Sequence, residues 1–188
     1  MKKGNEDLTY LYQALASKVD AWRSGGYACD DFPAIREILE FAVEDDETGQ
    51  LRYLRRAQLR ALETYWYLRL VLGTPTIPEL YAKLFSKLPE RLRAMGVSAK
   101  LFEEADYDYD SLIERVKSDN KFVREHQLES LRESLTLDYA SYILALAMGA
   151  GKTVLMGSIV ATEFALALEY PEGPFVEHAL IFAPVKPI

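Results

Sequence analysis

The chain has 188 residues, of which 49% are hydrophobic, and a formal net charge of −7. This composition is ordinary for a globular protein, and the acidic balance argues against strong nonspecific binding to nucleic acid. The single cysteine, Cys29, excludes an internal disulfide and is typical of a reducing, cytoplasmic location. The apolar stretch 144–168 is interrupted by Lys152 and by glycines, which predicts a protein core and no membrane partner.

Helical patterns dominate the first 118 residues. Apolar side chains recur every three or four residues from Leu8 to Val19, and Gly25 and Gly26 end that pattern. Further helices are expected over the ranges 31–43, 50–72, 79–86, 89–95, 99–105 and 111–117. The polar residues 118–120 then form a turn. We therefore predict an all-helical N-terminal domain over 1–118 and a second unit over 119–188.

The second unit has the pattern of a strand, a loop, a helix and another strand. Tyr142–Leu146 is an apolar run typical of a buried strand, and Val154–Tyr170 has a helical pattern. His178–Pro184 is typical of a second buried strand. Together these segments predict a βαβ unit with the loop 148–153 between its first strand and its helix.

The loop consists of Met148, Gly149, Ala150, Gly151, Lys152 and Thr153. It matches the phosphate-binding pattern GxxxxGK[ST] except at the first position, where the chain has Leu146. In such a loop the glycines let backbone N–H groups point at phosphates, Lys152 would bind the β- and γ-phosphates, and Thr153 would bind Mg²⁺. The loop therefore predicts an ATP–Mg²⁺ site. The alternative is a glycine-rich strand-to-helix turn with an incidental lysine.

Gln127 is the candidate for reading the nucleotide base. It follows a helical pattern and precedes the loop by about one helix and one strand. A glutamine amide both donates and accepts hydrogen bonds, which suits the edge of adenine. Arg124, on the same segment, would assist beside the base. The alternative is that Gln127 is simply a solvated residue on a helix.

These segments resemble motifs of superfamily 2 helicases and translocases. Arg124–Leu131 resembles their adenine-reading glutamine motif, and Phe182–Lys186 resembles the start of their next, nucleic-acid-contacting motif. Arg52–Arg69 resembles the helical leader of DEAD/DEAH-type proteins akin to the restriction (Res) subunit of type III restriction enzymes. The resemblance implies an α + α/β fold, in which the helical N-terminal domain is followed by an incomplete RecA-like P-loop βαβ unit, the start of an NTPase lobe.

The resemblance also implies a function, that of the N-terminal part of an ATP-dependent DNA helicase or translocase. ATP and Mg²⁺ would be the cofactors, DNA the partner of the full-length protein, and a modification methyltransferase subunit a further partner. No Asp-Glu-x-His or Asp-Glu-x-Asp motif occurs in the chain, and catalysis needs these carboxylates and a second lobe. No catalytic residue is therefore assigned, and these residues alone are expected to be inactive. The competing prediction is a noncatalytic helical protein-interaction module with a remnant P-loop unit.

Overall fold

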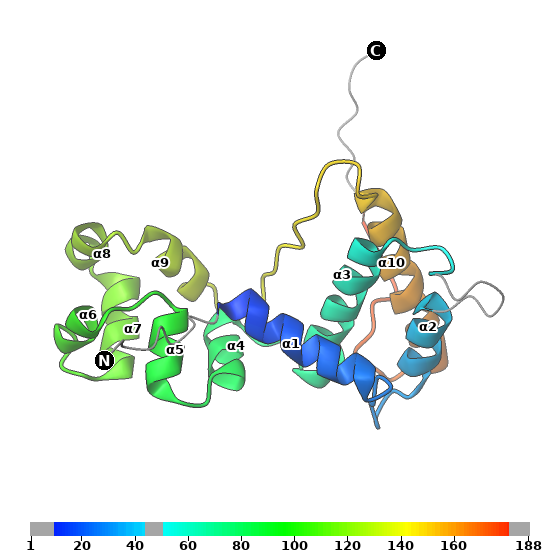
Figure 1. Cartoon of the computed structure of the whole chain (residues 1–188), viewed down its shortest axis with the longest axis horizontal. Helices are drawn as coiled ribbons and strands as arrows, with labels where there is room; N and C mark the ends of the chain where they lie inside the picture. Colours follow the sequence, from blue (N-terminus) through cyan, green and yellow to red (C-terminus); the bar gives the residue numbers. More distant parts are fainter. Residues whose placement is uncertain (1–9, 44–50, 181–188) are drawn as a thin grey trace, which may run out of the picture. The chain divides into compact units, whose positions relative to one another are not determined.

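The computed structural model describes residues 10–43 and 51–180, and every regular element in these ranges is a helix (Figure 1). The elements are α1 (Leu11–Ser24), α2 (Ala34–Val43), α3 (Arg56–Trp66), the π-helix η1 (Tyr67–Val71), α4 (Ile77–Leu84), α5 (Leu88–Ala94), α6 (Ala99–Glu103), α7 (Tyr109–Ser118), α8 (Asn120–His126), α9 (Glu129–Leu135) and α10 (Lys152–Glu169). No helix within the described ranges is long and apolar enough to cross a membrane.

The chain divides into two compact units. Unit 1 comprises Met1–Asp20, of which residues 10–20 are described, and Val71–Ile143. Unit 2 comprises Ala21–Leu70 and Leu144–Ile188, again only in their described parts. The chain therefore passes between the units within α1, at the end of η1 and after Ile143. The boundary expected at residues 118–120 lies inside unit 1, between α7 and α8.

Unit 1 is a set of short helices around a core of its own. Several of these helices begin at a side chain that accepts hydrogen bonds from the first free backbone N–H groups, as expected of N-caps. The Asp108 carboxylate accepts from the N–H of Ser111 at the start of α7, and the Asp119 carboxylate accepts from the N–H of Phe122 at the start of α8. The core consists of Leu92, Met95, Val97, Leu101, Ala105, Leu112, Val116, Phe122, Val123, Leu128 and Leu135.

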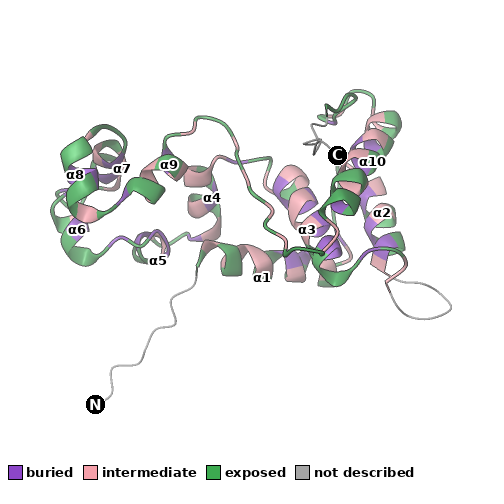
Figure 2. Ribbon diagram, turned by 90° about the horizontal axis from the view of Figure 1, so that it is seen from above, coloured by how far each residue is buried: buried purple, intermediate pink, exposed green. Residues whose placement is uncertain are grey.

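Unit 2 is built on α3, which packs against both α2 and α10, while α2 also packs against α10. Buried apolar side chains are spaced three or four residues apart in α2 and α3, as in Leu59 and Leu62 of α3. Along α2 and α10 buried positions alternate with exposed ones (Figure 2). Trp66 of α3 is the largest of the fully buried side chains.

The prediction of a RecA-like βαβ unit is wrong, because no residue in the described ranges lies in a β-strand. A strand must pair its backbone N–H and C=O groups with a neighbouring strand. Residues 140–147 have no regular secondary structure, the Ile143 side chain is 92% exposed, and the Tyr142 hydroxyl donates to the carbonyl of Pro75. The apolar run thus lies without a strand partner.

The second expected strand, His178–Pro184, is described only as far as residue 180. Residues 178–180 have no regular structure, and the Leu180 side chain is 81% exposed. The segment Phe182–Lys186 lies outside the described residues. The helix expected between the two strands is present as α10.

The unit 1 core provides a test of stability. The Phe122 ring is 2% exposed, and the guanidinium carbon of Arg115 lies 4.0 Å from the ring centroid. We expect Phe122→Ala to lower the free energy of unfolding by about 3–5 kcal/mol, because it removes a large buried ring and leaves a cavity. Urea unfolding followed by circular dichroism measures this change. Tyr139→Ala, at a 61% exposed position of the same unit, is the matched control; an equal loss in both variants would contradict the assignment of the core.

Candidate functional site

The backbone of the loop 148–153 turns sharply at its two glycines. Gly149 has φ +75° and Gly151 has φ +80°, values that residues other than glycine rarely adopt. Gly151 is the N-cap of α10, so Lys152 is the first residue of that helix. The two left-handed glycines therefore bring the chain directly from the irregular segment 140–147 into a helix of 18 residues.

The start of α10 presents backbone donors. The N–H groups of Val154 and Leu155 donate to the Gly151 carbonyl at 3.1 Å and 3.2 Å, which closes the first helical turn. The preceding N–H groups, of Lys152 and Thr153, have no carbonyl one turn earlier within the helix. They lie at the positive end of the dipole of a long helix, where anions are stabilised.

The lysine of the loop folds back over it. The Lys152 ammonium donates to the Ala147 carbonyl at 3.2 Å, and the N–H of Ala150 donates to the same oxygen at 3.2 Å. The side chains of Lys152 and Thr153 are exposed, and Met148 is 96% exposed. The ammonium is therefore held across the loop by a neutral carbonyl, and an anionic phosphate oxygen is the stronger hydrogen-bond acceptor.

Two side chains at the start of α3 donate hydrogen bonds to backbone carbonyls of the loop. The Arg55 guanidinium donates to the Gly149 carbonyl at 2.6 Å, and the Gln58 amide nitrogen donates to the Gly151 carbonyl at 2.9 Å. Neither residue was predicted from the sequence to lie beside the loop. The only local signal is the spacing from residue 55 to residue 58, which is that of a helix N-cap and its partner; nothing in the sequence connects them to glycines more than ninety positions away.

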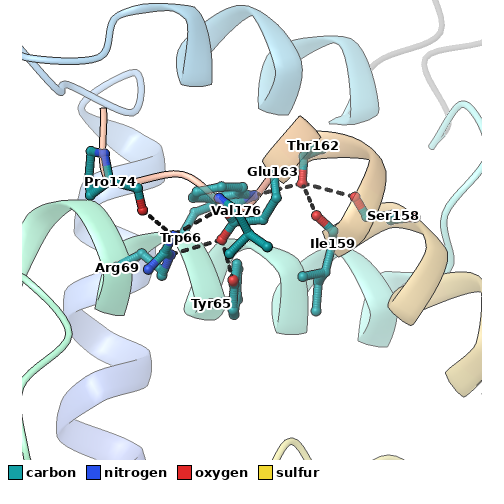
Figure 3. A network of polar contacts seen from close by, with 9 residues as sticks. All are labelled: Tyr65, Trp66, Arg69, Ser158, Ile159, Thr162, Glu163, Pro174 and Val176. Carbon is teal, nitrogen blue, oxygen red and sulfur yellow. Dashed lines mark hydrogen bonds and ion pairs between the residues drawn. The ribbon is translucent and has the colours of Figure 1, made fainter. Parts of the chain in front are cut away.

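Farther along α3, polar side chains fasten it to α10 (Figure 3). The Glu163 carboxylate of α10 is 3% exposed and accepts from the Tyr65 hydroxyl and, at 3.0 Å, from the Arg69 guanidinium. The Trp66 indole N–H donates to the Thr162 hydroxyl at 3.1 Å. Arg55 and Gln58 contact residues 149 and 151, and Trp66 and Arg69 contact residues 162 and 163, so α3 with η1 and α10 run parallel and both begin at the loop.

The same carboxylate fixes the chain that leaves α10. The N–H of Val176 donates to Glu163 at 2.9 Å, and the Arg69 guanidinium also donates to the Pro174 carbonyl at 2.7 Å (Figure 3). A buried carboxylate is tolerated only when it is paired and hydrogen-bonded. Glu163 therefore holds three segments together: α10, the end of α3 with η1, and residues 174–176.

A second buried carboxylate fastens the other side of α3. Glu63 is completely buried and accepts from the Tyr27 hydroxyl at 2.6 Å and from the Arg23 guanidinium, whose Nε lies 2.6 Å away. The ion pair and the hydrogen bonds to Glu63 raise the pKa of Arg23 above its usual range. α3 is thus anchored by one arginine–tyrosine–glutamate cluster on each side.

The other predicted binding residues lie in unit 1, whereas the loop lies in unit 2. Gln127 is the C-cap of α8 and has left-handed φ and ψ values of 54° and 47°. Gln127 and Arg124 are both exposed. The structure therefore brings Arg55 and Gln58 to the loop, and it places the predicted base-reading pair on a different unit.

The predicted Mg²⁺ ligand, Thr153, is exposed in the first turn of α10. Within the described ranges no three His, Cys, Asp or Glu side chains lie close enough together to hold a metal ion. A magnesium ion at this loop would therefore take one hydroxyl ligand from Thr153 and its remaining ligands from phosphate oxygens and water, the arrangement Mg²⁺ commonly adopts.

Comparison with known proteins adds no assignment: no family model matches the chain, and no curated protein or solved structure matches it. The resemblance to superfamily 2 helicases stays a prediction from the quoted motifs. The function proposed for the chain depends on the geometry of loop 148–153 and on the residues that hold it.

The tyrosines of the two clusters predict how the stability of unit 2 depends on pH. Burial, together with the hydrogen bond to Glu163, raises the pKa of Tyr65 above its ordinary value of about 10. The unfolded chain therefore releases this proton at lower pH than the folded protein does. The contribution of Tyr65 to stability is complete below its pKa in the unfolded chain. It is lost as pH rises through its pKa in the folded protein.

We expect the free energy of unfolding to fall more steeply from about pH 9 to about pH 11 in the unmodified protein than in Tyr65→Phe, which has no proton to release at this position. Urea unfolding at several pH values measures the two slopes. Tyr53→Phe, at a 52% exposed position of unit 2, serves as the control. Identical slopes for Tyr65→Phe and the unmodified protein would show that Tyr65 is not buried against Glu163.

Proposed function

We propose that loop 148–153 binds the phosphate tail of ATP together with Mg²⁺. The observation that carries this proposal is the start of α10 at Lys152, directly after two left-handed glycines, with the ammonium held 3.2 Å from Ala147 across the loop. Lys152 binds the β- and γ-phosphates by replacing the Ala147 carbonyl with phosphate oxygens. The N–H groups of the loop and of the first turn of α10 supply further donors, and Thr153 supplies a ligand to Mg²⁺.

The charges around the loop support an anionic ligand. Residues 48–62 and 139–162 contain no Asp or Glu, although the chain as a whole has a net charge of −7. The same two segments contain the cations Arg52, Arg55, Arg56, Arg60 and Lys152. Arg55 contacts the loop directly and Lys152 belongs to it, so two of these cations lie at the loop. A local excess of positive charge on an acidic protein attracts a phosphate-bearing ligand.

The loop is proposed to serve an ATP-dependent DNA helicase or translocase of which this chain is the N-terminal part, located in the cytoplasm. The quoted motifs support this assignment, with DNA and a modification methyltransferase subunit as partners of the full-length protein. Gln127 reads adenine and Arg124 assists it. Hydrolysis also requires a carboxylate that organises Mg²⁺ and water, and cationic groups that stabilise the transferred phosphoryl group, so the chain alone binds ATP without turning it over.

A noncatalytic helical interaction module is the second candidate. The observation in its favour is unit 1, whose helices α5–α9 enclose a core that contains no residue of the loop. Under this alternative the loop is a helix start with an incidental lysine. Binding measurements on the loop separate the two candidates.

The phosphate-binding proposal predicts that Lys152→Ala weakens binding of Mg–ATP. A hydrogen bond to a charged group contributes about 1.5–3 kcal/mol, so we expect a loss of affinity of about 10- to 150-fold. Isothermal titration calorimetry on the full chain measures it. Lys121→Ala, which removes an exposed lysine of α8 in unit 1, is the matched control. Equal affinities for Lys152→Ala and the unmodified protein would leave only the interaction-module candidate.

The base-reading role of Gln127 predicts a preference for ATP over GTP. The amide can both donate to and accept from adenine, so Gln127→Ala should reduce the preference by about 1–3 kcal/mol, the worth of a good bidentate pair. Competition between the two nucleotides, measured by calorimetry, gives the ratio of affinities. Gln13→Ala, which removes an exposed glutamine of α1, is the control. If the unmodified protein binds ATP and GTP equally, the adenine-reading role is wrong.

A further inference from the structure

The Gln58 side chain uses both ends of its amide. Its oxygen accepts from the N–H of Arg55 at 2.7 Å, and its nitrogen donates to the Gly151 carbonyl at 2.9 Å. The residue is 3% exposed. We propose that Gln58 is a positioning residue of the phosphate loop, which holds in place the backbone whose N–H groups bind phosphate. This role rests on the proposed phosphate binding by the loop.

The peptide bond between Gly151 and Lys152 connects a side chain on α3 with a backbone donor on α10. In a trans peptide the C=O and N–H groups point in opposite directions, and no cis peptide occurs in the described part of the chain. The Gly151 carbonyl accepts from the Gln58 amide as well as from the N–H groups of Val154 and Leu155, so the N–H of Lys152 points away from all three donors. The hydrogen bond from Gln58 therefore adds a tie from α3 to the first turn of α10 in holding this N–H in place.

The same contact removes a repulsive group from the site. A backbone carbonyl oxygen carries partial negative charge, so a carbonyl turned toward a bound phosphate would oppose binding. Gln58 holds the oxygen of Gly151 and Arg55 holds the oxygen of Gly149, both through donors on α3. Both carbonyl oxygens are thereby bonded to donors on α3, and the Gly151 oxygen also to the first turn of α10, so neither is free to turn toward a bound phosphate.

The fit between Gln58 and Gly151 leaves little freedom. Glycine is needed at position 151 for its φ of +80°, and a Cβ atom there would lie 2.3 Å from the Gln58 amide nitrogen and displace it from its hydrogen bond. The hydrogen bonds of Trp66 and Arg69 to Thr162 and Glu163 keep α3 from sliding along α10. Gln58 therefore has a fixed position on α3, from which it holds the backbone of the loop.

A positioning role and a base-reading role for Gln58 predict different behaviour toward a ligand without a base. The probe is inorganic tripolyphosphate with Mg²⁺, compared with Mg–ATP, and both are titrated into the full chain by calorimetry. Gln58→Met keeps the length of the side chain but removes both hydrogen bonds. We expect it to weaken binding of the two ligands by the same factor, about 3- to 10-fold, because one or two ordinary hydrogen bonds are lost.

A spectroscopic readout separates this effect from general destabilisation. The ¹H–¹⁵N resonance of Lys152 should shift in Gln58→Met without ligand, since the carbonyl of the same peptide loses a hydrogen bond, while the free energy of unfolding is measured in parallel. Gln58→Glu is the second variant: its carboxylate still accepts from Arg55 but cannot donate to Gly151, and it adds negative charge. It should weaken binding of both ligands more than Gln58→Met does. Gln13→Met is the matched control.

The outcomes are distinguishable. If both Gln58 variants bind tripolyphosphate as tightly as the unmodified protein, the positioning role is overturned. It is also overturned if the variants weaken binding of ATP alone, a result that would mean that the Gln58 amide contacts the base. If Lys152→Ala weakens binding while the Gln58 variants do not, the proposed function stands without this role. If the unmodified protein binds neither ligand, both proposals fail.

Discussion

Glu163 carries a carboxylate that is almost fully buried, and the position of the loop depends on how that carboxylate is satisfied. Arg69 and Tyr65 from the end of α3 and η1, and the backbone of Val176, all donate to it. Removing one partner from a buried ion pair is strongly destabilising because the other charge is left without compensation. The pair therefore acts less as a source of net stability than as a constraint that permits one register of α3 on α10.

This constraint explains an unusual feature of α10. Its buried face includes the polar side chains of Thr162 and Glu163, whereas Leu168 is 84% exposed and Val154 is 50% exposed. A surface helix normally buries its apolar stripe. In α10 apolar residues occur on every side, so their periodicity does not select a face. The hydrogen bonds to Trp66 and Arg69 select it, and the register that results places the Gly151 carbonyl opposite Gln58.

The sequence was sufficient for features that depend on neighbouring residues. Glycines followed by lysine and threonine predicted a turn into a helix, and the structure has that turn at Gly149 and Gly151 and the helix α10. It was insufficient for the apolar run at Tyr142–Leu146, since a short apolar run is compatible with a strand only when another segment pairs with it. The contacts of Arg55 and Gln58 with the loop could not be predicted from the sequence either, because they join positions about ninety residues apart and leave no local pattern.

The correction of the fold does not remove the chemistry of the loop, because each proposed phosphate donor is local to it. The N–H groups belong to the loop and to the first turn of α10, and the ammonium of Lys152 reaches only as far back as Ala147. In a βαβ unit, strands on either side would hold such a loop in place. Here α3 supplies the support through Arg55 and Gln58, and α3 is in turn held to α10 by Glu163. The proposed anion site requires a fixed backbone at this turn, and a pair of parallel helices joined by buried hydrogen bonds provides it.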